Sequence, residues 1–167
     1  MQHTLVALVE NQPGVLQRVA NLFSRRGFNI ESLAVGHTDT PERSRMTIVV
    51  NAADTQVDQV TKQLYKLINV LKVSDVTTDR TVDRELALIK VNASASTRAE
   101  IAQVVDIFRA RIVDLARDSL TVEVTGESEK IDSIVGLLRP FGLKEMVRTG
   151  RISMTRGSGA IGVNGSA

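Results

Sequence analysis

Residues 5–16 of the chain read Leu-Val-Ala-Leu-Val-Glu-Asn-Gln-Pro-Gly-Val-Leu, an apolar run followed by a polar turn. Residues 5–9 are apolar without interruption, which is typical of a strand buried on both faces. After the turn, apolar residues recur at Leu16, Val19, Ala20 and Phe23, the spacing of a helix with one face in a core. The stretch therefore predicts a buried strand over about 3–10 and a helix over about 13–26, which Gly27 would end.

The turn between these two elements is a candidate anion site. Pro13 suits the first helical position, and Gly14 would leave the first turn without a side chain. The N–H groups of Gly14, Val15 and Leu16 would then point outward at the positive end of the helix dipole. A small anion such as a carboxylate could bind there. An ordinary strand-to-helix turn is the alternative interpretation.

Composition narrows the class of protein. The chain has 167 residues, of which 43% are hydrophobic and 24% charged, as expected of one medium or two small globular domains. The net charge of +2 is a weak case for nucleic-acid binding, which needs a concentrated basic face. The absence of cysteine excludes disulfides and thiolate metal sites. We find no apolar run of membrane-spanning length and no signal peptide, so we expect a cytoplasmic protein without a membrane partner.

The order strand, helix, strand, strand, helix, strand occurs twice along the chain. Strands are expected over about 3–10, 28–35, 45–50 and 70–76, and again over 86–91, 112–116, 120–125 and 144–154. The predicted fold class is α+β, with two ferredoxin-like βαββαβ units in tandem. The predicted domains are an amino-terminal unit over 1–77, a linker over 78–84, a second unit over 85–156, and a disordered tail over 157–167.

Such a unit covers only one face of its sheet with helices. Because residues 5–9 are apolar on both sides, the other face should not meet water. A dimer that buries this face, or an edge-to-edge pairing of two sheets, is the simplest solution. The second unit has Asn92–Thr97 in place of the Pro-Gly turn, and we expect no recognisable amino-acid site there.

The chemistry-bearing residues do not form a catalytic set. His3 and His37 have no partners at metal-ligand spacing, and we expect both to be exposed strand residues. No P-loop, GxSxG or strand-to-helix GxGxxG pattern is present. An RNA-recognition module shares the predicted fold, but aromatic residues are only 3% of the chain and Phe28 alone could reach a strand. We expect no catalysis, no bound metal and no nucleic-acid partner.

Two segments, Glu10–Leu16 and Arg26–Leu33, resemble the signature of ACT domains, small modules that bind amino acids and regulate metabolic enzymes. Over its whole length the chain resembles the small regulatory subunits of acetolactate synthase (acetohydroxyacid synthase). This resemblance implies a non-catalytic subunit that binds and activates a large catalytic subunit. It also implies feedback inhibition by valine in branched-chain amino-acid biosynthesis. Thiamine diphosphate, magnesium and FAD are expected on the catalytic partner, with no cofactor on this chain. The alternatives are an ACT-type amino-acid sensor that regulates another enzyme and, less favoured, a ferredoxin-like RNA-binding module.

The resemblance also implies where L-valine binds, at the interface of two ACT units in a homodimer. One protomer would supply the helix start and the other the segment after the helix, the full set being Asn11, Gly14, Val15, Leu16, Asn29 and Ile30. Helix N–H groups suit the carboxylate, and the amide oxygens of Asn11 and Asn29 suit the ammonium group. In the alternative interpretation Asn29 only accommodates an unusual backbone angle, and Asn11 only caps the helix.

Overall fold

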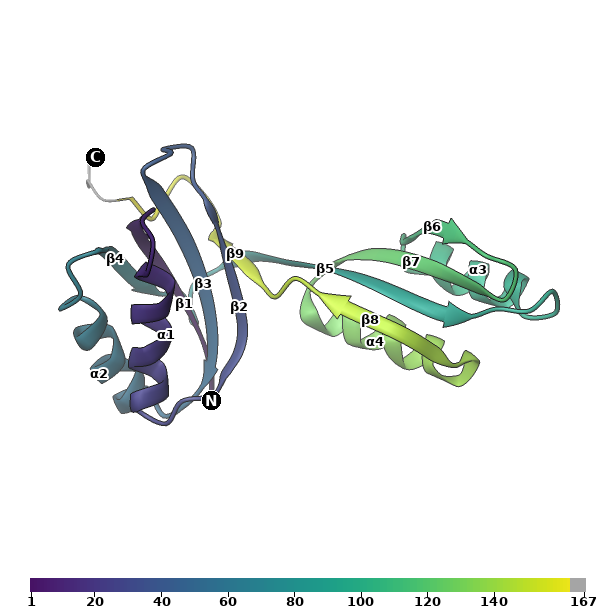
Figure 1. Cartoon of the computed structure of the whole chain (residues 1–167), viewed down its shortest axis with the longest axis horizontal. Coiled ribbons are helices and arrows are strands. Elements are labelled where there is room, and N and C mark those ends of the chain that lie inside the picture. The colour runs from purple at the N-terminus through teal and green to yellow at the C-terminus, as the bar shows by residue number, and fades with distance from the viewer. Residues whose placement is uncertain (163–167) are drawn as a thin grey trace. The chain divides into compact units, whose positions relative to one another are not determined.

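The computed structural model describes residues 1–162, which form two compact units (Figure 1). The first comprises residues 1–82 together with the segment from Arg151 onward, and the second comprises residues 83–150. Each unit consists of an antiparallel sheet and two α-helices. The predicted α+β fold class with tandem ferredoxin-like units is therefore confirmed. No helix in the described part of the chain is both long and apolar enough to cross a membrane.

In the first unit, four strands form a sheet in the order β2-β3-β1-β4. The elements are β1 (Gln2–Glu10), α1 (Val15–Arg25), β2 (Ile30–His37), β3 (Arg43–Asn51), α2 (Asp54–Leu64) and β4 (Val70–Asp75). Both helices lie on one side of the sheet (Figure 1). Leu5, Ala7 and Val9 of β1 point to that side and pack with Val19 and Phe23 of α1. The helix start therefore follows directly from the central strand.

The end of α1 matches the prediction for Gly27. This glycine has a φ of +73°, which an L-residue with a side chain rarely adopts. Its N–H donates to the carbonyl of Ser24 (3.0 Å), and the N–H of Phe28 donates to the carbonyl of Phe23 (3.1 Å). The Phe23 and Phe28 rings meet edge to face with centroids 6.2 Å apart. These contacts are those of a Schellman motif with its hydrophobic pair.

The other side of β1 is covered by the chain itself. Thr4, Val6 and Leu8 point to that side and are at most 6% exposed. The segment around β9 (Ile152–Thr155) lies there (Figure 1). The Arg151 side chain donates to Thr4 Oγ1 (3.2 Å). The Arg45 guanidinium donates to the Ser153 carbonyl (2.6 Å). The two-sided burial of residues 5–9 is confirmed, but it needs no second chain.

In the second unit the strand order is β6-β7-β5-β8. Its elements are β5 (Thr81–Asn92), α3 (Arg98–Ile107), β6 (Arg111–Leu115), β7 (Ser119–Gly126), α4 (Ser128–Leu138), a short 3₁₀ helix (Arg139–Phe141) and β8 (Leu143–Arg148). Ile89, Ile101 and Ile131 are fully buried in its core. Arg148 contacts Glu85 (2.5 Å) and Asp132 (2.6 Å). Against the effect of burial, hydrogen bonds to these two carboxylates raise the pKa of Arg148.

The largest differences from the predicted organisation lie around the linker and the carboxyl-terminal segment. The strand expected over 144–154 is two strands, β8 and β9, and β9 belongs to the first unit. The expected linker over 78–84 is not irregular throughout, because β5 begins at Thr81 and pairs with β9. The expected disordered tail is described as far as residue 162, and Ile161 and Gly162 are half-buried. Residues 163–167 of that tail lie outside the described residues.

Candidate functional site

The start of α1 has a different geometry from the one predicted. The helix begins at Val15, and Gly14 is its N-cap with a φ of +83°. The N–H of Arg18 donates to the Gly14 carbonyl (3.1 Å), which is the first helical hydrogen bond. The prediction that Pro13 is the first helical residue is therefore wrong, since Pro13 lies in the turn before the helix. Gly14 favours this turn because glycine adopts a left-handed backbone without strain, in addition to leaving the turn without a side chain.

Part of the predicted donor set remains available. The N–H of Val15 donates to the Gln12 carbonyl (3.4 Å), and its side chain is buried in the core. In the described part of the chain no acceptor takes the N–H groups of Gly14, Leu16 and Gln17. These groups lie at the positive end of the helix dipole, where an anion is favoured. The Leu16 side chain is 46% exposed beside them.

Asn11 lies at the end of β1 and contacts the loop between β2 and β3. Its N–H donates to the Glu42 carbonyl (2.8 Å), and Nδ2 donates to the Pro41 carbonyl (3.0 Å). Nδ2 also lies 3.4 Å from Nδ1 of His37, which is exposed as predicted. The alternative in which Asn11 caps α1 is wrong, because α1 has no side-chain cap. These contacts leave Oδ1 of Asn11 without a donor among the described residues, so it can accept from a ligand.

Asn29 and Ile30 lie beyond the opposite end of α1. Asn29 is exposed, and Ile30 packs partly against the core of its own unit. The alternative role for Asn29 is wrong, because Arg109 is the only residue other than glycine with a positive φ among those described. An 11-residue helix separates Gly14 from Asn29, a distance of about 16 Å at 1.5 Å per residue. One chain therefore does not bring the two groups of predicted site residues together.

Three polar side chains beside the helix start are linked by hydrogen bonds, and this network was not predicted from the sequence. Asn69, only 6% exposed, precedes β4 and its Nδ2 donates to Glu10 Oε2 (3.1 Å). The guanidinium of Arg18 donates to Oδ1 of the same amide. Glu10 and Arg18 are thus held at the turn by one buried side chain. Asn69 follows α2, far from the turn in sequence, and no local pattern links the three residues.

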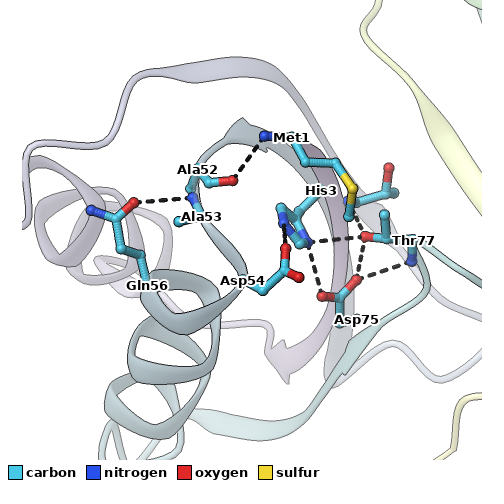
Figure 2. A network of polar contacts seen from close by, with 9 residues as sticks. Met1, His3, Ala52, Ala53, Asp54, Gln56, Asp75 and Thr77 are labelled. Carbon is cyan, nitrogen blue, oxygen red and sulfur yellow. Dashed lines mark hydrogen bonds and ion pairs between the residues drawn. The ribbon is translucent and has the colours of Figure 1, made fainter.

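His3 is buried, so the prediction that it is an exposed strand residue is wrong. It is 3% exposed, and its ring lies between two carboxylates (Figure 2). Nε2 lies 3.2 Å from Asp54 Oδ1, and Nδ1 lies 3.2 Å from Asp75 Oδ2. Thr77 Oγ1 donates to Asp75 and accepts from the N–H of Thr4 (3.0 Å). The cluster connects the first strand with the start of α2 and the end of β4. Within residues 1–162, no group of three or more His, Cys, Asp or Glu side chains could hold a metal ion.

The aromatic side chains pack against the two cores or bond to the backbone of their own unit. Phe23 and Phe28 pack in the first core, and Phe108 and Phe141 pack against the second. The Tyr65 hydroxyl donates to the carbonyl of Val73 (2.9 Å) and accepts from its N–H (3.0 Å). None of them offers a ring on an open sheet face for base stacking, which is the binding mode of an RNA-recognition module.

Comparison with known proteins covers nearly the whole chain. Residues 5–72 match the family model described as an AHAS small subunit-like ACT domain, and residues 84–157 match the small subunit of acetolactate synthase. The acetolactate synthase small subunit of Mycobacterium leprae is 57% identical over 96% of this chain and 95% of that protein. The Bacillus subtilis protein of the same name is 50% identical over 95% and 92%. The crystal structure of the Thermotoga maritima acetolactate synthase small subunit has a TM-score of 0.87 at 42% identity, covering 94% of this chain and 98% of that one.

Proposed function

The chain belongs to the family of acetolactate synthase small subunits, and we propose that it activates a catalytic subunit and makes that subunit sensitive to valine. Its ACT domain is the unit that contains the candidate effector site. Activation and feedback inhibition are separate properties. The first requires assembly with the catalytic subunit, and the second requires an amino-acid site as well.

The observation that carries the valine site is the geometry at Gly14. A left-handed N-cap without a side chain leaves N–H groups of the first turn open to a carboxylate. Oδ1 of Asn11 offers an acceptor for the ammonium group, and Leu16 offers apolar surface. A zwitterion bound this way needs no charged side chain, which suits an effector that must dissociate when its concentration falls.

A homodimer is part of the same proposal, but its support is not the apolar strand from which a dimer was predicted. The two-sided apolar strand no longer supports it, because the chain covers that strand itself. The support comes from Asn29 and Ile30, which can complete a site at Gly14 only when they come from a second chain. Catalysis and its cofactors, thiamine diphosphate, magnesium and FAD, belong in this proposal to the catalytic subunit.

The test is reconstitution with the catalytic subunit of the same organism. Acetolactate formation is measured for the catalytic subunit alone, with the chain added, and with valine added to each. We expect the chain to raise the rate and valine to lower it only when the chain is present. A catalytic subunit inhibited by valine without the chain would contradict the regulatory role. A chain that binds valine but leaves the rate unchanged would favour the sensor of another enzyme.

A further inference from the structure

The first unit contains a cavity that the proposed function does not use. It has a volume of ≈ 310 Å³ and lies between the β2–β3 loop and the segment that follows β9. Its lining includes Arg43 and Arg45 of β3, Leu8 of β1, Met154 of β9, and Ile161 of the segment that follows β9. A cavity of this size is at the lower end of the range for ligand sites and suits a small molecule.

Arg45 is a cation with no matching anion among the described residues. Burial lowers the pKa of its guanidinium, and no carboxylate within residues 1–162 acts in the opposite direction. It donates to the Ser153 carbonyl (2.6 Å), and no carboxylate in residues 1–162 forms an ion pair with it. Arg148 is the contrasting case in the same chain, because two carboxylates offset its burial. A partly desolvated guanidinium gains most from an anion that brings its charge into the cavity.

The apolar residues that line the cavity favour some anions over others. Leu8 is 6% exposed, and Ile161 is half-buried, so together with Met154 they offer apolar contact within the same cavity as the two arginines. A strongly hydrated inorganic anion gains nothing from these side chains. A molecule with a carboxylate at one end and a compact aliphatic group at the other uses both kinds of lining. Asp39, the acid in the lining, is exposed and belongs to the loop.

We propose that this cavity binds small monocarboxylates with a compact aliphatic body, and that Arg45 is the partner of the carboxylate. The site is complete within one chain, unlike the effector site proposed at Gly14. The two sites also differ in their donors, which are guanidinium groups here and backbone N–H groups there. The proposal therefore does not depend on valine binding at the helix start.

Met154 allows the cavity to be observed directly in the full chain. The protein has four methionines, and Met154 is the one that lines the cavity, while Met46 is fully buried in the core. Methyl-labelled methionine gives one resonance for each of them by NMR. We expect sodium isovalerate to shift the Met154 resonance with saturation at concentrations on the order of 1–10 mM. The Met46 resonance should not move, and isovaleramide, which has the same shape without the charge, should bind at least about tenfold more weakly.

Variants separate the carboxylate partner from a general charge effect. Arg45→Gln should abolish saturation, and Arg45→Lys should retain it because the cation is kept. Arg25→Gln, which removes an exposed charge on α1, is the matched control and should bind as the unmodified chain does. Gly14→Asp should leave the Met154 response unchanged, so failure here is distinguishable from failure of the valine site. Equal shifts with sulfate and isovalerate, equal binding of isovaleramide, or saturation in Arg45→Gln would each overturn the proposal.

Discussion

At the scale of single residues, backbone conformation decides what Gly14 can tolerate. A Pro-Gly pair before an apolar helical pattern is compatible with Gly14 in the first turn or with Gly14 as a left-handed N-cap. The pattern of apolar residues is the same in both cases, so the sequence could predict the location of the helix start and not this angle. With φ at +83°, any side chain introduces strain, even though no atom beyond Gly14 and its two chain neighbours lies within 4 Å of the added Cβ position.

Gly14→Asp and Gly14→Asn form a matched pair for the valine site. Both side chains have the same shape and tolerate a left-handed backbone better than most, so each should cost about 1 kcal/mol of stability. Only the aspartate adds a negative charge where the effector carboxylate would bind. We expect valine inhibition of the reconstituted enzyme to be lost in Gly14→Asp and largely kept in Gly14→Asn. Urea unfolding provides the stability control, and equal inhibition of both variants would contradict the site.

His3 shows what a local sequence pattern cannot reveal. It stands near the chain start among polar residues, which favours exposure, yet Asp75 lies 72 positions away in sequence and 3.2 Å away in space. The position of the first strand between β3 and β4 brings these groups together, and that position depends on the whole sheet.

Replacing His3 tests whether the cluster stabilises the fold. His3→Leu removes the partner of Asp54 and of Asp75, and we expect a loss of about 1–3 kcal/mol in the free energy of unfolding. His37→Leu is the control, because His37 is exposed and its only polar side-chain contact among the described residues, to Asn11, is 3.4 Å long. That variant should change stability by less than about 0.5 kcal/mol. Equal losses in the two variants, measured by urea unfolding, would show that the buried cluster contributes nothing.

At the scale of elements, β9 is the part of the fold that the sequence could not place. Residues 143–148 and 152–155 follow one another with a short polar break, and both have apolar residues, so a single strand fits the pattern. In the structure, residues 149–151 separate the two strands, and the segment around the second strand, β9, covers one side of β1. The need to cover β1 was predictable from residues 5–9. The segment that does so was not, because covering from within the chain and covering by a second copy satisfy the same apolar pattern.

Two truncations test this covering role. A chain ending at Gly150 lacks β9 and would expose the side of β1 that carries Thr4, Val6 and Leu8. We expect it to unfold at lower urea concentration, to bind a hydrophobic dye and to self-associate in sedimentation velocity. A chain ending at Arg156 keeps β9 and should behave as the full chain does in these measurements. If the shorter truncation were as stable and as little associated as the longer one, β9 would not be what protects β1.

At the scale of the whole molecule, the two units share a fold and differ where a ligand would bind. The repeated apolar spacing predicts both sheets and all four helices, because it depends only on which side of each element is buried. The start of α3 differs from that of α1: Thr97 is its N-cap with a φ of −105°, in place of a left-handed glycine. The geometry on which the predicted effector site rests therefore occurs in the first unit and not in the second. Within the first unit, α1 separates the predicted site residues at the helix start from Asn29 and Ile30.

Mixing two defective chains tests whether the site is shared between protomers. In a dimer, each site would combine the helix start of one chain with Asn29 of the partner subunit. Gly14→Asp and Asn29→Ala homodimers should both fail to confer valine inhibition. In the mixed dimer one site carries both changes, and the other carries neither and is intact. Random exchange should therefore restore about a quarter of the sites.

The readout is acetolactate formation by the reconstituted enzyme, with each variant alone and after the two are unfolded together and refolded. Partial recovery of valine inhibition in the refolded mixture alone is the expected result. Mixing Gly14→Asp with Asn11→Ala is the control, because both changes lie on the same side of the site. In that mixture every site contains a defective helix start, so it should not recover. Recovery in neither mixture would mean that Asn29 and Gly14 do not meet across a dimer, and recovery in both would mean that the chains do not contribute different parts of the site.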